Sequence, residues 1–290
     1  MMFSKSFPII SIKNVDYIYP NGTHALRNVS LNINKGELIA IMGQNGAGKT
    51  TLIRMLNGLL RPSKGSVYIE KKDISSKTIA DLSKVVGIVF QNPSHQLFSN
   101  TIDDEINFSL KNLELNPEQI EMTKDTILKS FDLLKYQNRS PLNLSGGESK
   151  KLAIASIICR DPSILVFDEP TLGQDAKEIK FFIDLINTEL DRSKTIIIVT
   201  HNVEFTMEHI PRTILMTQGK ILADGPTEKI LSNELLIKES SLIIPQLFQF
   251  KNALTEINLN IPEEIYRESQ LINFLDNYLR KIKKVKGDVR

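Results

Sequence analysis

The sequence is short of cysteine, of net charge and of long apolar runs, and each shortage excludes a class of protein. Its one cysteine, Cys159, cannot form a disulfide within the chain, and the apolar stretch around it predicts a buried thiol. A net charge of +2 gives no reason to expect nucleic acid as a partner. No apolar run approaches the roughly 20 residues of a membrane-spanning helix, and Met1–Lys5 lacks the apolar stretch of a signal peptide. We therefore expect the chain to stay in the cytosol and to reach a membrane only through a partner.

The size and composition favour a globular protein with a large core. A chain of 290 residues exceeds an ordinary single domain, and it is 41% hydrophobic and 24% charged. We find neither an internal repeat nor a low-complexity segment. One large α/β domain followed by an appendage is therefore expected.

Residues 43–50 form a Gly-rich segment that matches the Walker A pattern GxxxxGK[ST] without a substitution. An apolar run, 38–42, precedes it and a stretch with helical spacing, 51–56, follows it, which predicts a strand, a turn and a helix. Backbone N–H groups in such a turn point at phosphate oxygens, although a Gly-rich turn of purely structural use is the alternative. We expect Lys49 to bind the β- and γ-phosphates of a nucleotide and the Thr50 hydroxyl to bind Mg²⁺. The candidate nucleotide-binding residues are Gly43, Gln44, Asn45, Gly46, Ala47, Gly48, Lys49, Thr50 and Thr51.

Four apolar runs rich in β-branched residues each end in a polar residue or a glycine. Their continuous apolar character predicts strands that are buried on both faces, as in a parallel sheet covered by helices. Ligands of such sheets bind at the carboxyl ends of the strands, so we expect the four ends to surround one phosphate site. The runs are 38–42 before Gly43, 85–90 before Gln91, 164–167 before Asp168 and Glu169, and 196–200 before His201.

Asp168 and Glu169 follow the pattern of a Walker B strand, four apolar residues and then an acid. The Asp168 carboxylate can hold Mg²⁺ through its water shell. Glu169 is placed to orient and deprotonate an attacking water. A charged turn after a strand is the alternative, but it is unexpected in a chain with a complete Walker A segment. His201 also follows a buried strand, and we expect it to be functional, whereas the other histidines are expected to be structural.

The segment Leu144-Ser145-Gly146-Gly147-Glu148 (LSGGE, here the signature motif) precedes a predicted helix. Ser145 and Glu148 fit a capping box, with serine at the N-cap and glutamate three residues later. The two glycines between them expose N–H groups and the positive end of the helix dipole to an anion. The two interpretations are compatible, and we hold both.

The Walker A segment, Asp168-Glu169 and LSGGE, in this chain order, resemble the ATP-binding cassette (ABC) ATPases over residues 9–228. The resemblance implies an α/β P-loop NTPase core at 1–228, with a helical subdomain inserted at about 92–159, and an extension at 229–290. It also implies an enzyme that hydrolyses ATP with Mg²⁺ between two cassettes. Because this chain holds one cassette, the second must come from another ABC ATPase subunit, identical or paralogous.

The resemblance assigns roles to single residues as well. Glu169 matches the catalytic base of the family and His201 the switch histidine that contacts the γ-phosphate. Gln91 matches the Q-loop residue that senses Mg²⁺ and the γ-phosphate and connects to the transport partner. We therefore expect Glu169, His201 and Gln91 to be catalytic, with Thr50, Gln91 and Asp168 around the metal.

Other positions of the motifs match residues that meet the nucleotide or the second subunit. Ser145, Gly146 and Gly147 match residues that bind the γ-phosphate held on the opposite subunit. Asp175 matches the D-loop aspartate at the dimer interface, although Gln174 stands where leucine is usual. Tyr19 matches the aromatic residue that stacks on adenine. Tyr17 lies two residues away in a strand-like segment and would face the same side, so the sequence does not separate the two.

Residues 91–102 resemble the QNPxxQxF stretch of energy-coupling-factor (ECF) transporter ATPases, which drive uptake of vitamins and transition metals. This resemblance implies a peripheral position on the cytoplasmic face of the membrane. Its implied partners are a polytopic coupling protein and a separate membrane subunit that binds the substrate. Thr101 is a predicted N-cap, and we expect that Asp103, Asp104 or Glu105 receives an arginine of the coupling protein. Which substrate is carried stays open, as does the role of residues 229–290 in pairing the subunits.

Two alternatives belong to other classes: a cassette of another importer type, and a non-transport ABC ATPase of DNA repair or translation. Repair cassettes are split by a long coiled coil, and no extended heptad pattern occurs between Gln91 and Leu144. Translation-factor cassettes need two copies in one chain. A kinase or GTPase does not account for LSGGE.

Overall fold

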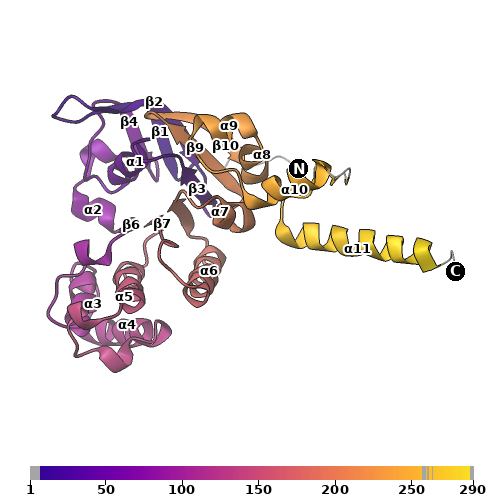
Figure 1. Cartoon of the computed structure of the whole chain (residues 1–290). Helices are drawn as coiled ribbons and strands as arrows, with labels where there is room; N and C mark the ends of the chain where they lie inside the picture. Colours follow the sequence, from indigo (N-terminus) through magenta and orange to yellow (C-terminus); the bar gives the residue numbers. More distant parts are fainter. Residues whose placement is uncertain (1–6, 257–258, 260, 263, 288–290) are drawn as a thin grey trace, which may run out of the picture.

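The larger of two sheets carries the strands predicted to end in functional residues. The computed structural model describes residues 7–256, 259, 261–262 and 264–287 (Figure 1). In this part of the chain a 6-stranded sheet has the order β10-β9-β3-β8-β7-β6, parallel except for β10 at one edge. Its strands are β3 (Leu38–Met42), β6 (Val86–Val89), β7 (Ile164–Asp168), β8 (Thr195–Val199), β9 (Arg212–Thr217) and β10 (Lys220–Pro226).

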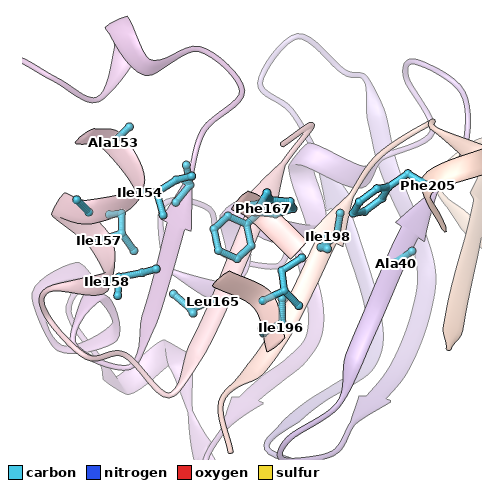
Figure 2. Packing of buried hydrophobic residues seen from close by; sticks show 14 of the residues in the cluster. Ala40, Ala153, Ile154, Ile157, Ile158, Leu165, Phe167, Ile196, Ile198 and Phe205 are labelled. Atoms are coloured by element: carbon cyan, nitrogen blue, oxygen red, sulfur yellow. The ribbon is translucent and has the colours of Figure 1, made fainter. Parts of the chain in front are cut away.

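The four apolar runs of the sequence are the neighbouring strands β3, β8, β7 and β6 of this sheet. Each strand contributes alternate side chains to two buried clusters. Ile39 of β3 packs into one cluster, and its neighbour Ala40 packs into the other. In Figure 2, Leu165 and Phe167 of β7 and Ile196 of β8 pack with side chains from the surrounding helices. Both faces of the sheet are therefore covered, and the expected α/β class is confirmed.

A 4-stranded antiparallel sheet covers one face of the larger sheet, with the order β2-β1-β4-β5. Helix α1 lies in the cluster between the two sheets, where Leu52 and Ile53 are fully buried. A short helix, α2, precedes β6. The elements are β1 (Ile10–Ile18), β2 (His24–Ile33), β4 (Lys64–Ile69), β5 (Lys72–Asp73), α1 (Lys49–Leu56) and α2 (Ile79–Ser83).

Between β6 and β7 the chain leaves the sheet and forms a separate helical lobe (Figure 1). Polar N-caps start its helices: Thr101, Asn116 and Ser145 each accept a hydrogen bond from the backbone N–H three residues on. The predicted N-cap at Thr101 is therefore confirmed. The helices are α3 (Ile102–Leu110), α4 (Pro117–Ser130) and α5 (Gly146–Ile158).

The chain after β10 forms further helices, the last of which projects from the body (Figure 1). The backbone N–H of Gln246 donates to Glu204 Oε1 on α7 over 2.7 Å, which ties α10 to the large domain. Leu271 of α11 is buried, whereas Tyr278 farther along is exposed. The helices after β10 are α8 (Thr227–Leu231), α9 (Glu234–Glu239), α10 (Gln246–Glu256) and α11 (Glu268–Gly287), whereas α6 (Ala176–Asp191) follows β7 and α7 (Val203–His209) follows β8.

Among the described residues we find no helix with the length and apolar character needed to cross a bilayer.

Candidate functional site

The Gly-rich loop lies between β3 and α1, as the sequence predicts, and its glycines have two different reasons to be there. Gly43 has φ +142°, and a Cβ at this position would lie 2.1 Å from the carbonyl oxygen of Met216. Gly48 has φ +102°, and its Cβ would lie 2.7 Å from the carbonyl oxygen of Ala25. Both glycines are therefore required by close packing. Gly46, with φ +83°, faces open space at the exposed tip beside Asn45, so conformation alone favours glycine there.

The Lys49 ammonium points into the concave side of this loop. Its Nζ donates to the carbonyl oxygen of Gly43 over 2.6 Å and to that of Gln44 over 3.0 Å. Burial lowers the pKa of Lys49, and the negative charges of Glu169 and Asp168 act in the opposite direction. The cation is thus held where phosphate oxygens would approach the loop, with its charge facing the two acids.

Asp168, the last residue of β7, lies in a setting that disfavours its negative charge. Burial, and then the charge of Glu169, raise the pKa of Asp168 to about 6, against the opposing effect of Lys49 and Arg54. Thr50, in the first turn of α1, presents an exposed hydroxyl at the same edge. Oxygen donors such as these are the ligands that Mg²⁺ prefers, and a dication would relieve the repulsion between the two carboxylates.

The described residues contain no cluster of three or more acidic, histidine or cysteine side chains that could enclose a metal. This agrees with the way Mg²⁺ is bound in nucleotide sites, where few protein oxygens are used and waters and phosphates complete the shell. Thr50 and Asp168 therefore fit a Mg²⁺ ion that arrives with its nucleotide.

Glu169 is fixed by the neighbouring strand β8 and the residues that follow it. Its Oε2 accepts a hydrogen bond from Thr200 Oγ1 over 3.0 Å, and its Oε1 lies 2.7 Å from His201 Nδ1. The backbone is held too: φ is +48°, and the Glu169 N–H donates to the Val199 carbonyl oxygen over 2.8 Å. Glu169 is 9% exposed, and its negative charge acts on the pKa of Lys49. Thr200 is a partner that the sequence placed at this edge without assigning it a role.

Gln91 follows β6, the edge strand beside β7, and is exposed. The structure therefore places Gln91 on the same edge of the sheet as Asp168 and His201. The residues after it turn at once: Asn92 caps a 3₁₀ turn, Pro93–His95, by accepting from the Ser94 N–H over 3.0 Å. The loop thus leaves the sheet edge within a few residues and enters the helical lobe.

Tyr19 and Tyr17 lie side by side near the start of α1. Their rings meet edge to face with centroids 4.8 Å apart, so they face the same side as predicted. The Tyr19 hydroxyl is 3.0 Å from Thr51 Oγ1, which joins Tyr19 to the first turn of α1 directly after Lys49 and Thr50. Of the two, Tyr19 is therefore the tyrosine that hydrogen-bonds to α1, the helix after the Gly-rich loop.

The signature motif starts α5 with the capping box that its sequence predicts. Ser145 Oγ accepts from the Glu148 N–H over 3.3 Å, and Glu148 Oε2 accepts from the Ser145 N–H over 2.9 Å. The pKa of Glu148 is lowered, first by the backbone hydrogen bond from Ser145. Ser145 and Gly146 are exposed, and α5 lies in the helical lobe, apart from α1 (Figure 1). Within one chain the signature motif therefore lies apart from the Gly-rich loop that precedes α1.

Asp175 has a structural role that the sequence analysis missed, although the spacing Asp-x-x-Glu signals it. It caps α6, where its Oδ1 accepts from the Glu178 N–H over 2.8 Å and Glu178 Oε2 accepts from the Asp175 N–H over 3.2 Å. Glu178 also contacts the signature motif, because a Cβ on Gly147 would lie 1.9 Å from Glu178 Oε1. Asp175 and the signature motif are thus neighbours.

With this geometry in place, comparison with known proteins identifies the family. A family model described as "ABC transporter" matches residues 26–172, which is about half of the chain. The chain therefore belongs to the ABC transporter family of ATP-binding proteins, and the resemblance seen in the sequence is confirmed.

Relatives within the family carry more specific names. An "Energy-coupling factor transporter ATP-binding protein EcfA" of Methanosarcina acetivorans is 39% identical over 257 residues, 88% of this chain and 93% of that protein. Another EcfA, from Methanothermobacter thermautotrophicus, is 37% identical over 90% of this chain and 86% of that protein. Other relatives are longer: the chain spans 44% of a "Putative ABC transporter ATP-binding protein" of Methanosarcina acetivorans, at 38% identity over 92% of its own length.

Solved structures agree with the fold. The cbiO1 protein of Clostridium perfringens, described as part of the ABC transporter complex cbiONQ, matches with a TM-score of 0.72 and 30% identity, over 85% of this chain and 99% of that one. A dimeric ATP-binding cassette in a post-hydrolysis state, bound to ADP and phosphate, matches with a TM-score of 0.68 and 28% identity, over 75% of this chain and 98% of that one. The expected P-loop cassette fold is confirmed.

Proposed function

We propose that this chain is the ATP-hydrolysing subunit of an ECF-type importer on the cytoplasmic face of a membrane, where it drives uptake of a vitamin or a transition-metal ion. The observation that carries the proposal is the convergence of Lys49, Asp168, Glu169 and His201 at one edge of a parallel sheet. The EcfA relatives and the cbiO1 structure support the transport assignment.

The chemistry follows from these side chains. Lys49 and the N–H groups of the Gly-rich loop bind the phosphates and hold the γ-phosphate in place. Thr50, Asp168 and Gln91 would hold Mg²⁺, which would supply positive charge against the charge on the phosphate oxygens. Glu169 accepts the proton of the attacking water.

His201 and Thr200 prepare Glu169 for this step. Their hydrogen bonds to the two carboxylate oxygens fix the direction in which the carboxylate points. A base that is already oriented loses little entropy when the water arrives. His201 is half exposed, so it also remains within reach of an incoming γ-phosphate.

A complete site requires a second cassette, identical or paralogous. Ser145 and Gly146 expose the N-terminus of α5 to solvent, and Asp175 is exposed beside them. In the proposed dimer these residues meet the ATP that the partner cassette binds, so two ATP molecules lie between the two subunits. The N–H groups of α5 then contact a γ-phosphate with no change in their own helix.

We propose that the membrane coupling protein docks in a groove of the helical lobe. The rings of Phe98 and Phe108 stand at its mouth, both exposed, edge to face with centroids 4.7 Å apart. An apolar residue of a docking helix would pack against these rings and leave water. Glu105 and Arg160 also line the groove.

The three acidic side chains in the first turn of α3 already have partners within the chain. These partners limit which of the three can accept an arginine of the coupling protein. Asp103 pairs with Lys124 over 2.9 Å, and Asp104 accepts from the Thr101 hydroxyl over 2.7 Å. Glu105 is only 2% exposed and accepts from the N–H groups of Phe98 and Ser99. Of the three acids, the proposal therefore favours the exposed Asp104 as the acceptor of a partner arginine.

The helices after β10 are proposed to help pair the subunits. Along α11, Leu271, Leu275 and Tyr278 recur at the spacing of one helix face, and exposure rises from the buried Leu271 to the exposed Tyr278. A helix that leaves the body with an apolar face is suited to pack on a second subunit.

The proposal is tested by purifying the full-length tagged chain from the membranes of its host and identifying bound proteins by mass spectrometry. The expected result is a second ABC ATPase together with a polytopic membrane protein, and ATP hydrolysis by the complex. Co-purification with ribosomes or with DNA-repair proteins, and without a polytopic membrane protein, would overturn the transport assignment.

A further inference from the structure

The side chain of Gln96 connects the loop that carries Gln91 to α5, the helix that begins at the signature motif. Its Nε2 donates to the Ala153 carbonyl oxygen over 2.6 Å and to Ser156 Oγ over 3.1 Å, both on α5. Its Oε1 faces back toward the sheet, 3.4 Å from the N–H of Phe90, the residue before Gln91. Gln96 therefore spans from the start of the Gln91 loop to the middle of α5.

A second fastening lies a few residues farther along the loop. Glu105 Oε2 on α3 accepts from the N–H groups of Phe98 and Ser99, over 3.0 and 2.9 Å. Leu97, between the two fastenings, is buried in the hydrophobic cluster of the helical lobe. By contrast Gln91 and Asn92 are exposed. The loop thus has an exposed beginning at the sheet edge and an end that is fixed to the lobe.

The contact on α5 is well placed to move the signature motif. Ala153 lies seven residues after Gly146, so about 10 Å of continuous helix separates the Gln96 contact from the first turn. The second half of this length is packed, with Lys150, Leu152 and Ala153 buried. A displacement applied at Ala153 and Ser156 therefore reaches Ser145 and Gly146 without being lost in a flexible joint.

The hydrogen bonds of Gln96 are not required to satisfy α5. The Ala153 carbonyl lies inside the helix, where it accepts the ordinary backbone bond, and it also accepts from Ser156 Oγ over 3.0 Å. Gln96 itself is partly exposed, so water can solvate its amide if the contact is lost. Loss of Gln96 would therefore remove a mechanical link while it leaves few buried groups unpaired.

We propose that Gln96 is a positioning residue that couples the two ATP sites of a cassette pair. The Gln91 loop responds to the ATP bound by this chain, and Gln96 passes that movement to α5, which presents the signature motif to the ATP of the partner. The inference rests on the proposed pairing of two cassettes. Gln96 itself touches neither nucleotide.

The test compares Gln96→Met with Gln119→Met in the full chain, assembled with the cassette that co-purifies with it. Methionine keeps the length of glutamine and removes its hydrogen bonds. Gln119 serves as the control because its Oε1 accepts only a capping bond from the Asn116 N–H in the same lobe. For Gln96→Met we expect kcat to fall about tenfold, the Hill coefficient for ATP to fall toward one, and KM and ATP binding by the isolated chain to stay within about twofold. For Gln119→Met all four quantities should stay close to those of the unmodified chain.

A double-mutant cycle with Ser156→Ala separates coupling from packing. If Gln96 acts through α5, the two substitutions will not add, because Ser156 Oγ is part of the same contact. Additive effects, or a Gln96→Met protein whose loss of kcat merely follows a lowered Tm, would overturn the inference.

ATP-dependent pairing in a Glu169→Gln background distinguishes the inference from the function on which it rests. Pairing by Glu169→Gln that weakens about tenfold when Gln96→Met is added supports the coupling role. Equal pairing with and without Gln96→Met overturns the coupling role and leaves the proposed function standing. Absence of any ATP-dependent pair in Glu169→Gln overturns both.

Discussion

His201 Nδ1 lies 2.7 Å from Glu169 Oε1, so the proposed base and the proposed switch histidine are in contact. The second carboxylate oxygen is held by Thr200 Oγ1 at 3.0 Å. These contacts come from two neighbouring parallel strands, whose pairing sets Asp168 opposite Val199. The geometry around Glu169 therefore depends on the pairing of β7 with β8.

Replacing this base should separate binding from chemistry. In Glu169→Gln the amide keeps the size of the side chain but cannot accept a proton, so we expect ATP to bind with unchanged affinity and kcat to fall by about 10²- to 10⁴-fold. With Mg²⁺-ATP the variant should accumulate as a pair of cassettes in size-exclusion chromatography. Hydrolysis at the rate of the unmodified protein would show that another group is the base.

Replacing Lys49 should act on binding itself. In Lys49→Ala the buried cation that faces the phosphate site is removed, so the Kd of a fluorescent ATP analogue should rise by about 10- to 100-fold. Lys35→Ala, which removes an exposed lysine elsewhere, is the control and should leave the Kd unchanged. If the two variants bind equally well, the Gly-rich loop is a structural turn.

The two tyrosines can be told apart by a matched pair of substitutions. Tyr19 is bonded to Thr51 in the first turn of the phosphate-binding helix, whereas Tyr17 contacts Tyr19. We expect Tyr19→Ala to raise the Kd for ATP about tenfold through the loss of base stacking, and Tyr17→Ala to raise it by less than about threefold. Isothermal titration calorimetry measures both. A larger effect from Tyr17→Ala would reverse the assignment.

Replacing Asp168 with asparagine should raise the stability of the chain and lower its ATPase activity. Burial and Glu169 raise the pKa of Asp168 to about 6, so the folded chain keeps a proton that the unfolded chain releases near pH 4. Between these values the folded state binds more protons, and its stability falls as the pH rises. Asp168→Asn removes this loss, so at pH 7 without nucleotide the Tm should rise by about 2–4 °C.

The advantage of Asp168→Asn in thermal unfolding should shrink as the pH is lowered from 7 toward 4, because the native carboxyl is then protonated. ATP hydrolysis by the same variant should fall, since the amide binds Mg²⁺ more weakly than a carboxylate. A Tm that is lowered at pH 7 would contradict the pKa argument, and an unchanged rate would contradict the metal role.

The docking groove makes a prediction about transport. Phe108→Ala removes one of two exposed rings at its mouth, so reconstituted uptake should fall several-fold more than the ATPase rate of the isolated subunit. The exposed Met122 on α4 lies outside the groove lining, and Met122→Ala provides a control that should leave uptake intact. Uptake that is equal in both variants would place the coupling protein elsewhere.

Some features were predictable because they depend on local sequence. The continuous apolar runs predicted β3, β6, β7 and β8, since only strands covered on both faces need such runs. The N-caps at Thr101 and Ser145 were predictable because each hydroxyl lies three residues before the backbone N–H from which it accepts a hydrogen bond. The four strand ends followed from one rule about parallel sheets, and the structure places them at one edge.

Other features depend on how distant segments approach and had no local signal. Glu105 looked like an acid in the first turn of a helix, yet its carboxylate is buried against the N–H groups of Phe98 and Ser99. The link from Gln96 to Ala153 joins residues far apart in the chain, so no spacing could indicate it. Thr200 was placed correctly at the end of its run, but its bond to Glu169 required the register of two strands.

Gly147 lies against Oε1 of the Glu178 carboxylate. The other oxygen of this carboxylate, Oε2, accepts a hydrogen bond from the Asp175 N–H. One carboxylate therefore sets the spacing between the signature motif and the cap of α6, the two segments proposed to face another cassette. A side chain at 147 would require the end of the Glu178 side chain to move, and a shorter residue at 178 would lose the hydrogen bond from the Asp175 N–H. A change at Glu178 would consequently alter both segments that are proposed to face another cassette, although Glu178 belongs to neither motif.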